Sequence, residues 1–208
     1  MIEFKNFSIK YVNDFYSIFN LNLKIEKNIL LLGDRLDGGF ALMRALSKID
    51  KTYTGEILIN NKNIKQIKDK NLDLSYVSYT PTLFKFKTAK QNIIYPLTLR
   101  KYDKKSCDNL AQNLLEKYHI NFGEIKVKNL TISEAKITTL LRAIVRKPKI
   151  ILLEHFFENL DEKYLVLANK IIEDIDPEIL TITTEQTKQI CFENFEIHTI
   201  KNGSLIDW

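Results

Sequence analysis

Cysteine is scarce in this chain of 208 residues, and its two cysteines lack any spacing typical of a metal or redox site. Cys107 and Cys191 lie far apart in the sequence, so we expect both thiols to be reduced and structural. His119, His155 and His198 are dispersed as well, which gives little support to a zinc site. The sequence therefore predicts no metal centre.

Long apolar runs are also missing. No stretch approaches the roughly 20 apolar residues that a membrane-spanning helix needs. The opening letters MIEFKNFSIKY alternate like a strand and lack the anatomy of a signal peptide. These two absences favour a cytoplasmic protein.

Charge of one sign is not gathered in any single arm of the chain. The formal charge is +5, and the lysines and arginines are scattered, for example over Lys62–Lys70 and Lys101–Lys105. A basic chain can approach nucleic acid or an anionic membrane surface. The scatter favours a solvated, lysine-rich surface over either of these.

What the sequence does have is a glycine loop between a strand pattern and a helix pattern. The apolar run Ile29–Leu32 precedes the letters GDRLDGGFAL, in which Gly33 and Gly38 have the spacing of the phosphate-binding motif G-x-x-x-x-G-K-[ST]. Gly39 stands where that motif has its lysine, and Phe40 stands where it has a hydroxyl. The frame of a phosphate loop is therefore present without its two chemical side chains.

Hydrophobic periodicity predicts an α/β chain whose strands and helices are arranged around this loop. Period-two or wholly apolar patterns predict strands at Ile2–Ile9, Leu21–Ile25, Ile29–Leu32, Thr54–Asn60, Leu74–Val77, Lys149–Leu153 and Ile179–Thr183, with a final hairpin over Glu196–Asp207. From about Thr80 to Lys147 the pattern is helical, with apolar faces at Cys107–Tyr118 and Ser133–Arg146, and a later helix is predicted at Lys163–Ile175.

The order of several passages resembles the ATP-binding subunit of an ABC transporter over essentially the whole chain. LLGDRLDGGFALMRAL is similar to the Walker A strand, loop and helix of that family. NLTISEAKITTLLRAIVRKPKIILLEHFFENLD is similar to its signature helix, Walker B strand and D-loop, and TITTEQ to its switch strand. The resemblance implies an α/β, P-loop NTPase-like (RecA-like) core with a mixed sheet, an N-terminal antiparallel β-subdomain and an inserted α-helical subdomain. It implies one domain over 1–208, with the core at about 1–79 and 148–208 and the helical subdomain at about 80–147.

The catalytic residues of the family are replaced at the matching positions. Glu154 and His155 stand where Walker B has aspartate and the catalytic glutamate. Tyr79 replaces the Q-loop glutamine, and Thr184 replaces the switch histidine. Glu154 keeps a carboxylate that could contact magnesium, and His155 could act as a base near neutral pH, but a base is useful only beside a bound, polarised phosphate. A substituted position without catalytic demand explains both better, so the resemblance implies no catalytic residue and no metal ligand in this chain.

A remnant of a nucleotide site remains. Tyr11 matches the aromatic residue that stacks on adenine in the family, and Gly33, Gly38 and Gly39 frame the start of a helix that could hold an anion. ATP with magnesium is at most a weak ligand on this reading. No cofactor is expected.

The signature segment, which the family lends to a partner's nucleotide, is altered as well. Ile132 and Glu134 replace a glycine and a neutral glutamine of the LSGGQ pattern, whereas the D-loop letters NLD at Asn159–Asp161 are retained. One chain thus carries a damaged phosphate loop and a damaged signature. Dimer geometry is expected to outlast the chemistry.

Three functions remain open. The leading hypothesis is a non-hydrolysing ABC ATPase-like subunit, a docking or structural module at the cytoplasmic face of the inner membrane. Its partners would be a membrane permease subunit and a second ABC ATPase-like subunit, either itself or an intact paralogue. Thr82–Leu99 matches the region of the family that receives the permease. Core packing explains its apolar character equally well. Its letters NIIYPL are nearer to importer, lipoprotein-release and cell-division members of the family. The alternatives are a divergent, ATP-coupled transport subunit and a nucleic-acid-associated ABC protein, which the diffuse charge disfavours.

Overall fold

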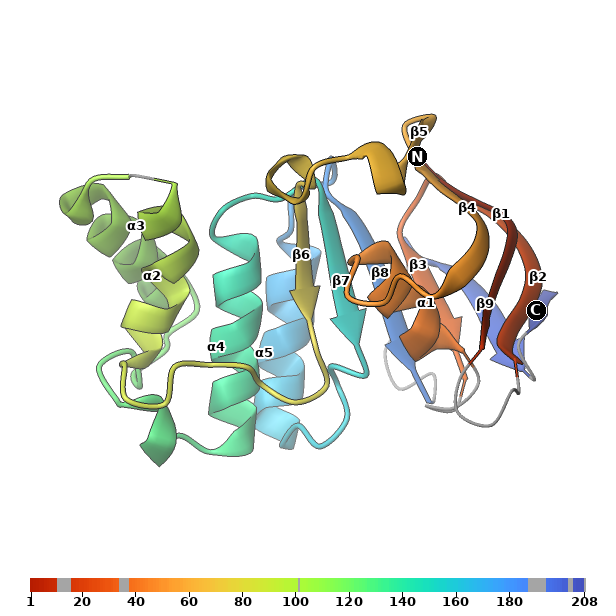
Figure 1. Ribbon diagram of the computed structural model, residues 1–208. Coiled ribbons are helices and arrows are strands. Elements are labelled where there is room, and N and C mark those ends of the chain that lie inside the picture. Colours follow the sequence, from red (N-terminus) through yellow and green to blue (C-terminus); the bar gives the residue numbers. More distant parts are fainter. Residues whose placement is uncertain (11–15, 34–37, 101, 187–193, 202–203, 208) are drawn as a thin grey trace. The chain divides into compact units, whose positions relative to one another are not determined.

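The structure is a computed structural model that describes residues 1–10, 16–33, 38–100, 102–186, 194–201 and 204–207. The chain divides into two compact units (Figure 1). The first comprises Met1–Tyr76, Leu152–His155 and Leu180–Trp208, and the second comprises Val77–Ile151 and Phe156–Ile179.

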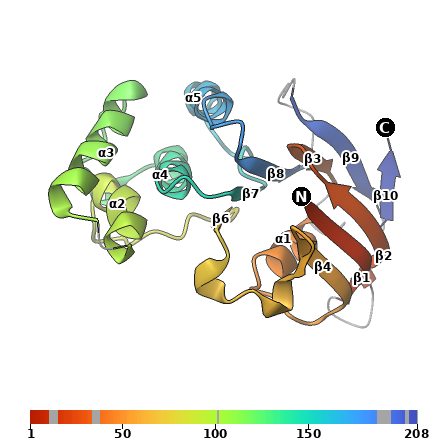
Figure 2. The ribbon, with the colours of Figure 1, turned by 90° about the horizontal axis from the view of Figure 1, so that it is seen from above.

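An antiparallel sheet opens the first unit, with the strand order β2-β1-β4-β5. Its strands are β1 (Ile2–Lys10), β2 (Tyr16–Ile25), β4 (Tyr53–Ile59) and β5 (Lys62–Asn63). Figure 2 shows β2, β1 and β4 side by side. The buried apolar residues of β1 follow the predicted period of two from Ile2 to Phe4 and from Phe7 to Ile9, with a step of three between Phe4 and Phe7.

The register of this sheet shifts where β1 passes β4. Asn6 has a positive φ of 47°, and Gly55 on β4 has a φ of 79°. A Cβ on Gly55 would lie 2.3 Å from the carbonyl oxygen of Asn6. Only glycine fits this irregularity, which curves the sheet.

The second sheet is mixed, with the order β10-β9-β3-β8-β7-β6. Its strands are β3 (Ile29–Leu32), β6 (Leu74–Val77), β7 (Ile150–Glu154), β8 (Leu180–Glu185), β9 (Glu196–Lys201) and β10 (Ser204–Asp207). β3 runs parallel to β8 and β9, whereas β10 closes a hairpin with β9. Every residue of β3 and β7 is buried, which is typical of the inner strands of a parallel sheet. Helix α1 (Gly39–Leu46) follows the loop after β3.

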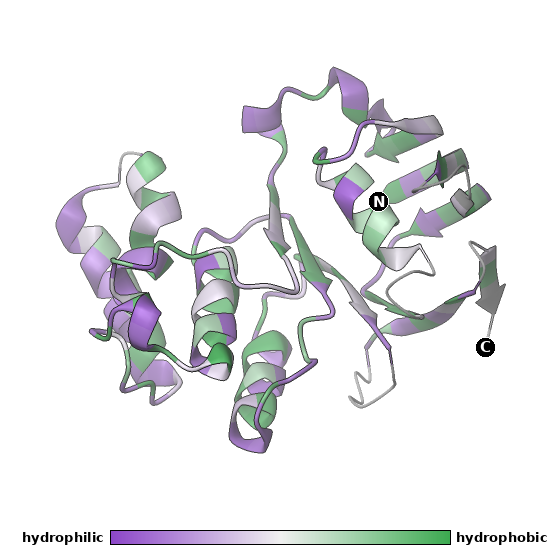
Figure 3. Ribbon diagram, turned by 60° about the horizontal axis from the view of Figure 1, so that its bottom comes forward, coloured by the Kyte–Doolittle hydropathy of each residue, from purple (hydrophilic) through white to green (hydrophobic). Residues whose placement is uncertain are grey.

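The second unit is mainly helical. Its helices are α2 (Ala89–Leu99), α3 (Lys104–Lys117), α4 (Ile132–Ile144) and α5 (Glu162–Glu173). Short 3-10 turns lie at Val127–Asn129 here and at Ile64–Gln66 and Asp69–Asn71 in the first unit. Apolar and polar residues alternate around these helices (Figure 3), and α2 packs against both α3 and α4. Within the described ranges, no helix has the length and hydropathy that a membrane span requires.

The helical region was predicted to begin at about Thr80, but the first helix of the second unit, α2, begins at Ala89. The fully buried side chain of Asn92 holds the preceding turn. It accepts a hydrogen bond from the Phe84 amide at 2.8 Å and donates to the carbonyl oxygens of Phe84 and Thr88 at 3.2 and 2.9 Å. The segment is thus anchored as a loop rather than extended as a helix.

Candidate functional site

The glycines predicted to hold phosphate lie at the end of β3 and the start of α1. The Gly33 amide donates to the carbonyl oxygen of Glu185 on β8 at 3.0 Å. Gly38 precedes α1 with a φ of 105°, and a Cβ there would lie 2.4 Å from the Ser17 carbonyl oxygen. Gly38 is therefore required by the packing of the helix start against β2. Tyr11 and residues 34–37 lie outside the described residues.

Gly39 is closed in by the neighbouring strand. A Cβ at this position would lie 2.9 Å from Cγ2 of Thr184, which is itself buried. The lysine of the phosphate-loop motif would have to start from this Cβ, and the Thr184 methyl occupies the space beside it. Two substitutions that the sequence presented separately, Gly39 and Thr184, are thus one packing arrangement in the structure.

The next turn of α1 carries a cation that faces an aromatic ring. The Arg44 guanidinium lies 5.1 Å from the centre of the Phe40 ring. Phe40 is half-buried at the position where the motif places a magnesium-binding hydroxyl. A phenyl ring offers no oxygen to a hard cation such as magnesium, which prefers oxygen ligands.

Glu154, the Walker B carboxylate position, has a partner within the first unit. It ends β7, is only 6% exposed, and accepts a short hydrogen bond from the Tyr76 hydroxyl on β6. These two residues are 78 positions apart, and no sequence pattern connects them. A phenol donating to this carboxylate competes directly with a metal ion.

His155 is held by its backbone in a left-handed conformation with a φ of 42°. Its amide donates to the Thr184 carbonyl oxygen at 2.9 Å and to the Thr184 hydroxyl at 3.3 Å. The ring is buried, with 2% of the residue exposed. A catalytic base must reach a water molecule beside phosphate, and this burial does not favour that role.

The signature segment forms a closed set of contacts at the start of α4. Thr131 and Glu134 make a capping box, and the Glu134 carboxylate also accepts from the Tyr164 hydroxyl at 3.2 Å. Burial and this carboxylate raise the pKa of Tyr164. The Ser133 hydroxyl donates to the Asp161 carboxylate at 2.7 Å. Ile132, by contrast, is 66% exposed and presents an apolar side chain.

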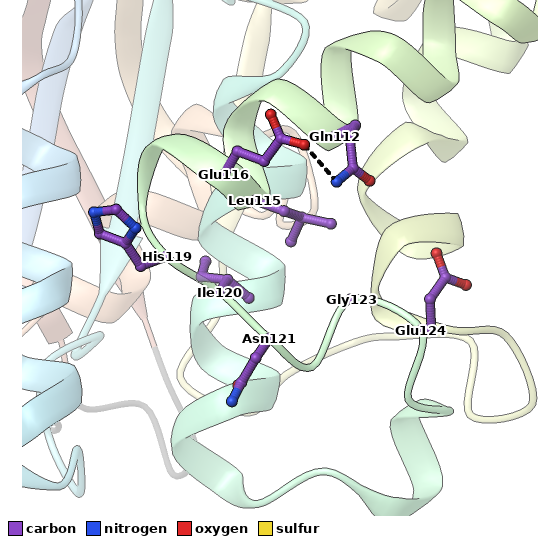
Figure 4. A pocket seen from close by; sticks show the side chains of 8 residues that line it. All are labelled: Gln112, Leu115, Glu116, His119, Ile120, Asn121, Gly123 and Glu124. Carbon is purple, nitrogen blue, oxygen red and sulfur yellow. Dashed lines mark hydrogen bonds between the residues drawn. The ribbon is translucent and has the colours of Figure 1, made fainter.

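A surface pocket of about 470 Å³ lies in the helical unit, lined by the end of α3 and the following turn (Figure 4). Figure 4 shows the Gln112 amide beside the Glu116 carboxylate, joined by a hydrogen bond of 2.8 Å. Glu124 on the opposite rim pairs with Lys90 at 3.9 Å. None of the residues predicted to bind nucleotide lines this pocket.

Two residues that the structure makes prominent were not predicted from the sequence, Tyr76 in the first unit and Lys136 in the second. Lys136 interrupts the apolar face of the Ser133–Arg146 pattern and is only 3% exposed. A lysine on an apolar helix face is a visible signal, because lysine is rarely buried without partners. Tyr76 gave no such signal, since an aromatic residue is ordinary in a strand.

With this geometry in view, comparison with known proteins identifies the family. The family model for ABC transporters matches residues 16–156, which is more than half of the chain. The chain belongs to the ABC transporter family. Its position there is that of the ATP-binding, or nucleotide-binding, domain, as the sequence resemblance predicted.

Curated relatives are similar at low identity. A spermidine/putrescine import ATP-binding protein, PotA, of Lawsonia intracellularis is 28% identical over 166 residues, which cover 78% of this chain and 45% of the relative. A probable sulfate/thiosulfate import ATP-binding protein, CysA, of Chlorella vulgaris is 25% identical over 203 residues, covering 95% of this chain and 86% of the relative. The chain spans about half the length of several curated relatives that it matches, at 44% to 50%.

Solved structures confirm the predicted α/β, P-loop NTPase fold. The ATP-binding cassette MJ0796, solved as a dimer bound to ADP and Pi, superposes with a TM-score of 0.85 at 20% identity, covering 100% of this chain and 98% of that one. The cbiO1 protein of Clostridium perfringens gives a TM-score of 0.82 at 18% identity, covering 99% of this chain and 86% of that one. At these identities the likeness concerns the fold alone.

Proposed function

We propose that this chain is a catalytically degenerate ABC ATPase-like subunit that acts as a non-hydrolysing docking or structural module. The packing of Thr184 against Gly39 is the observation that carries the proposal. The position from which a lysine would reach the terminal phosphates is closed by the residue that stands in for the switch histidine. This crowding supports the proposal that more than one substitution underlies the loss.

The residues present do not suit magnesium and a triphosphate. Phe40 offers no hydroxyl, and Glu154 already accepts from Tyr76. In the signature segment, Glu134 adds a negative charge where an anion would approach. Gly33, Gly38 and Gly39 would remain as a weak anion site at the start of α1, and Tyr11 as an aromatic platform.

The partners that we propose are a membrane permease subunit and a second ABC ATPase-like subunit. Relatives such as PotA and CysA are named as import ATP-binding proteins. By analogy with such import systems, we propose that this chain is one ABC ATPase-like domain at the cytoplasmic face of a membrane, peripheral to the permease. The retained D-loop at Asn159–Asp161 supports pairing with a second such subunit.

The surface that we assign to the permease is the turn before α2, within Thr82–Leu99. Phe86 is 80% exposed and Phe84 is 42% exposed. The turn is not loose, because Asn92 fixes Phe84 and the amides of Val127 and Lys128 donate to the carbonyl oxygens of Lys87 and Lys85, both at 3.0 Å. A rigid turn that presents exposed phenylalanine suits docking, since exposed apolar anchors carry much of the energy of an interface.

Nucleotide titration tests the loss of ATP binding. A ligand at 100 times its dissociation constant stabilises a protein by about 2.7 kcal/mol. A chain that does not bind ATP gains no such stabilisation. Thermal unfolding with millimolar Mg-ATP should then leave the melting temperature of this chain unchanged. Inorganic tripolyphosphate controls for anion effects on a basic protein, and MJ0796 serves as the intact cassette. A saturable increase specific to Mg-ATP would refute the degenerate reading.

Membrane association tests the docking surface. Inside-out vesicles of the source organism should retain the wild-type chain, and Phe86→Lys should abolish this retention. Phe19→Lys is the matched control, because Phe19 is also an exposed phenylalanine, at 60%, but lies outside the proposed surface. Equal loss with both variants, or full retention on protease-stripped vesicles, contradicts a permease partner.

The second candidate is a divergent ATP-binding subunit that couples ATP to transport. The names of the relatives favour it, as does the survival of two glycines at the start of α1. The same titration separates the two candidates, because only this one requires stabilisation by Mg-ATP.

A further inference from the structure

Lys136 is a buried cation in the middle of α4. It is 3% exposed and lies on the helix face that also buries Ser133, Ile137 and Leu140. Removing an ammonium group from water is costly unless its surroundings replace the lost hydration.

The groups around Lys136 replace the lost hydration of its ammonium group. Its Nζ donates to the carbonyl oxygen of Phe156 at 2.9 Å and to that of Glu158 at 2.6 Å. The same nitrogen lies 4.9 Å from the centre of the Tyr79 ring and 5.8 Å from that of the Phe156 ring. Two carbonyl dipoles and two ring faces form an environment that attracts a cation.

The carbonyl groups that Lys136 holds belong to the segment Phe156–Asp161, which connects β7 to α5. The segment contains Asn159 in a left-handed conformation with a φ of 59°. The Asn159 side-chain amide donates to the Tyr79 hydroxyl at 2.8 Å. At the far end, the Asp161 amide donates to the Ser133 hydroxyl at 3.1 Å. The segment is therefore fastened to α4 at both ends and to Tyr79 between them.

We propose that Lys136 serves as a covalently tethered cation that holds the segment Phe156–Asp161 against α4 and Tyr79. The conformation of this segment is therefore formed without any bound nucleotide. The ammonium group attracts the carbonyl oxygens and aromatic rings around it, as a bound monovalent cation would. Because it belongs to a side chain, it cannot dissociate. This proposal does not depend on the function proposed above.

Lys136→Met tests the charge while keeping the length and the apolar stem. Hydrogen bonds from charged donors are among the stronger ones, so amide exchange in Phe156–Asp161 should accelerate about tenfold or more. Exchange in α2 and α3 should change far less. Lys48→Met is the matched control, because Lys48 also donates to a backbone carbonyl, that of Ile67, at 2.6 Å in the other unit. It should leave Phe156–Asp161 unchanged.

Chemical rescue separates a cation from a space-filling side chain. Lys136→Ala leaves a cavity, and added propylammonium should restore slow exchange in Phe156–Asp161 in this variant but not in Lys136→Met. Tetramethylammonium carries charge without an N–H donor and should rescue less. Should Lys136→Ala fail to fold, the Lys136→Met comparison decides alone. Unchanged exchange in Lys136→Met, or acceleration spread evenly over the chain, overturns the proposal.

Discussion

At the scale of single residues, we expect Gly39 and Thr184 to be energetically coupled. Because a Cβ on Gly39 would lie 2.9 Å from the Thr184 methyl, we expect Gly39→Ala to destabilise the chain by about 1–3 kcal/mol, typical of overpacking. In a Thr184→Ser background the methyl is gone, while the hydroxyl that accepts from the His155 amide is kept. There Gly39→Ala should be neutral or mildly stabilising, because alanine favours helix more than glycine.

Wild type, Gly39→Ala, Thr184→Ser and the double variant form a double-mutant cycle. Urea unfolding of these four proteins measures the coupling energy directly. We expect an interaction energy of at least about 0.5 kcal/mol, since residues in contact are non-additive. Simple additivity of the two single changes would show that the contact does not exclude a side chain at position 39.

Tyr76 and Glu154 make a second prediction at this scale. Tyr76→Phe removes the hydroxyl donor and leaves a carboxylate that is 6% exposed without it. Loss of one partner of a buried hydrogen bond costs about 1–3 kcal/mol, and we expect a loss of that size in the free energy of unfolding. Glu154→Gln keeps an acceptor for the hydroxyl and should cost less. An equal cost for the two variants would argue against the hydrogen bond as the cause.

At the scale of elements, we expect the start of α3 to depend on the ionisation of its capping residue, Asp103. The Asp103 side chain accepts from the Ser106 amide at 2.9 Å. Hydrogen bonding from the Ser106 side chain, and then from the Ser106 amide, lowers the pKa of Asp103. A carboxyl whose pKa is lowered by folding stabilises the native state above its unfolded pKa of about 3.9. That contribution is lost as the pH falls through the lower, folded pKa.

Asp103→Asn is the matched variant, because asparagine caps a helix comparably but does not titrate in this range. Amide exchange at Ser106 and Cys107 should therefore be similar in wild type and variant at pH 6, and the wild type should lose protection relative to the variant as the pH falls below about 3.9. A difference that stays constant with pH would exclude the carboxylate as the cause.

The elements also show how far the sequence could be read. The sequence pattern predicts β3 at Ile29–Leu32 and β6 at Leu74–Val77, the bounds found in the structure, because one is a short apolar run and the other a short alternating one. It failed for the turn before α2, where the buried side chain of Asn92 competes for the backbone. The missing lysine and hydroxyl at Gly39 and Phe40 were also visible in the sequence. The partners of Glu154 and Lys136 were not, since these contacts join residues far apart in the chain and depend on the completed fold.

At the scale of the whole molecule, the formal charge of +5 should act separately from the docking surface. Scattered lysines attract any anionic membrane, and salt screens this attraction beyond about 8 Å at physiological ionic strength. Binding to vesicles of anionic lipid alone should thus be weak, fall steeply as salt rises, and be unaffected by Phe86→Ala. Phe84 and Phe86 would instead contribute apolar burial, which salt does not weaken.

Cosedimentation with native inside-out vesicles over a salt series tests this separation. We expect two fractions, one removed by about 0.5 M salt and common to every variant, and one resistant to salt and lost in Phe86→Ala. Pure lipid vesicles should show only the first. If the salt-resistant fraction persists in Phe86→Ala, another surface must hold the permease. If it also forms on pure lipid, the chain binds the bilayer itself rather than a protein within it.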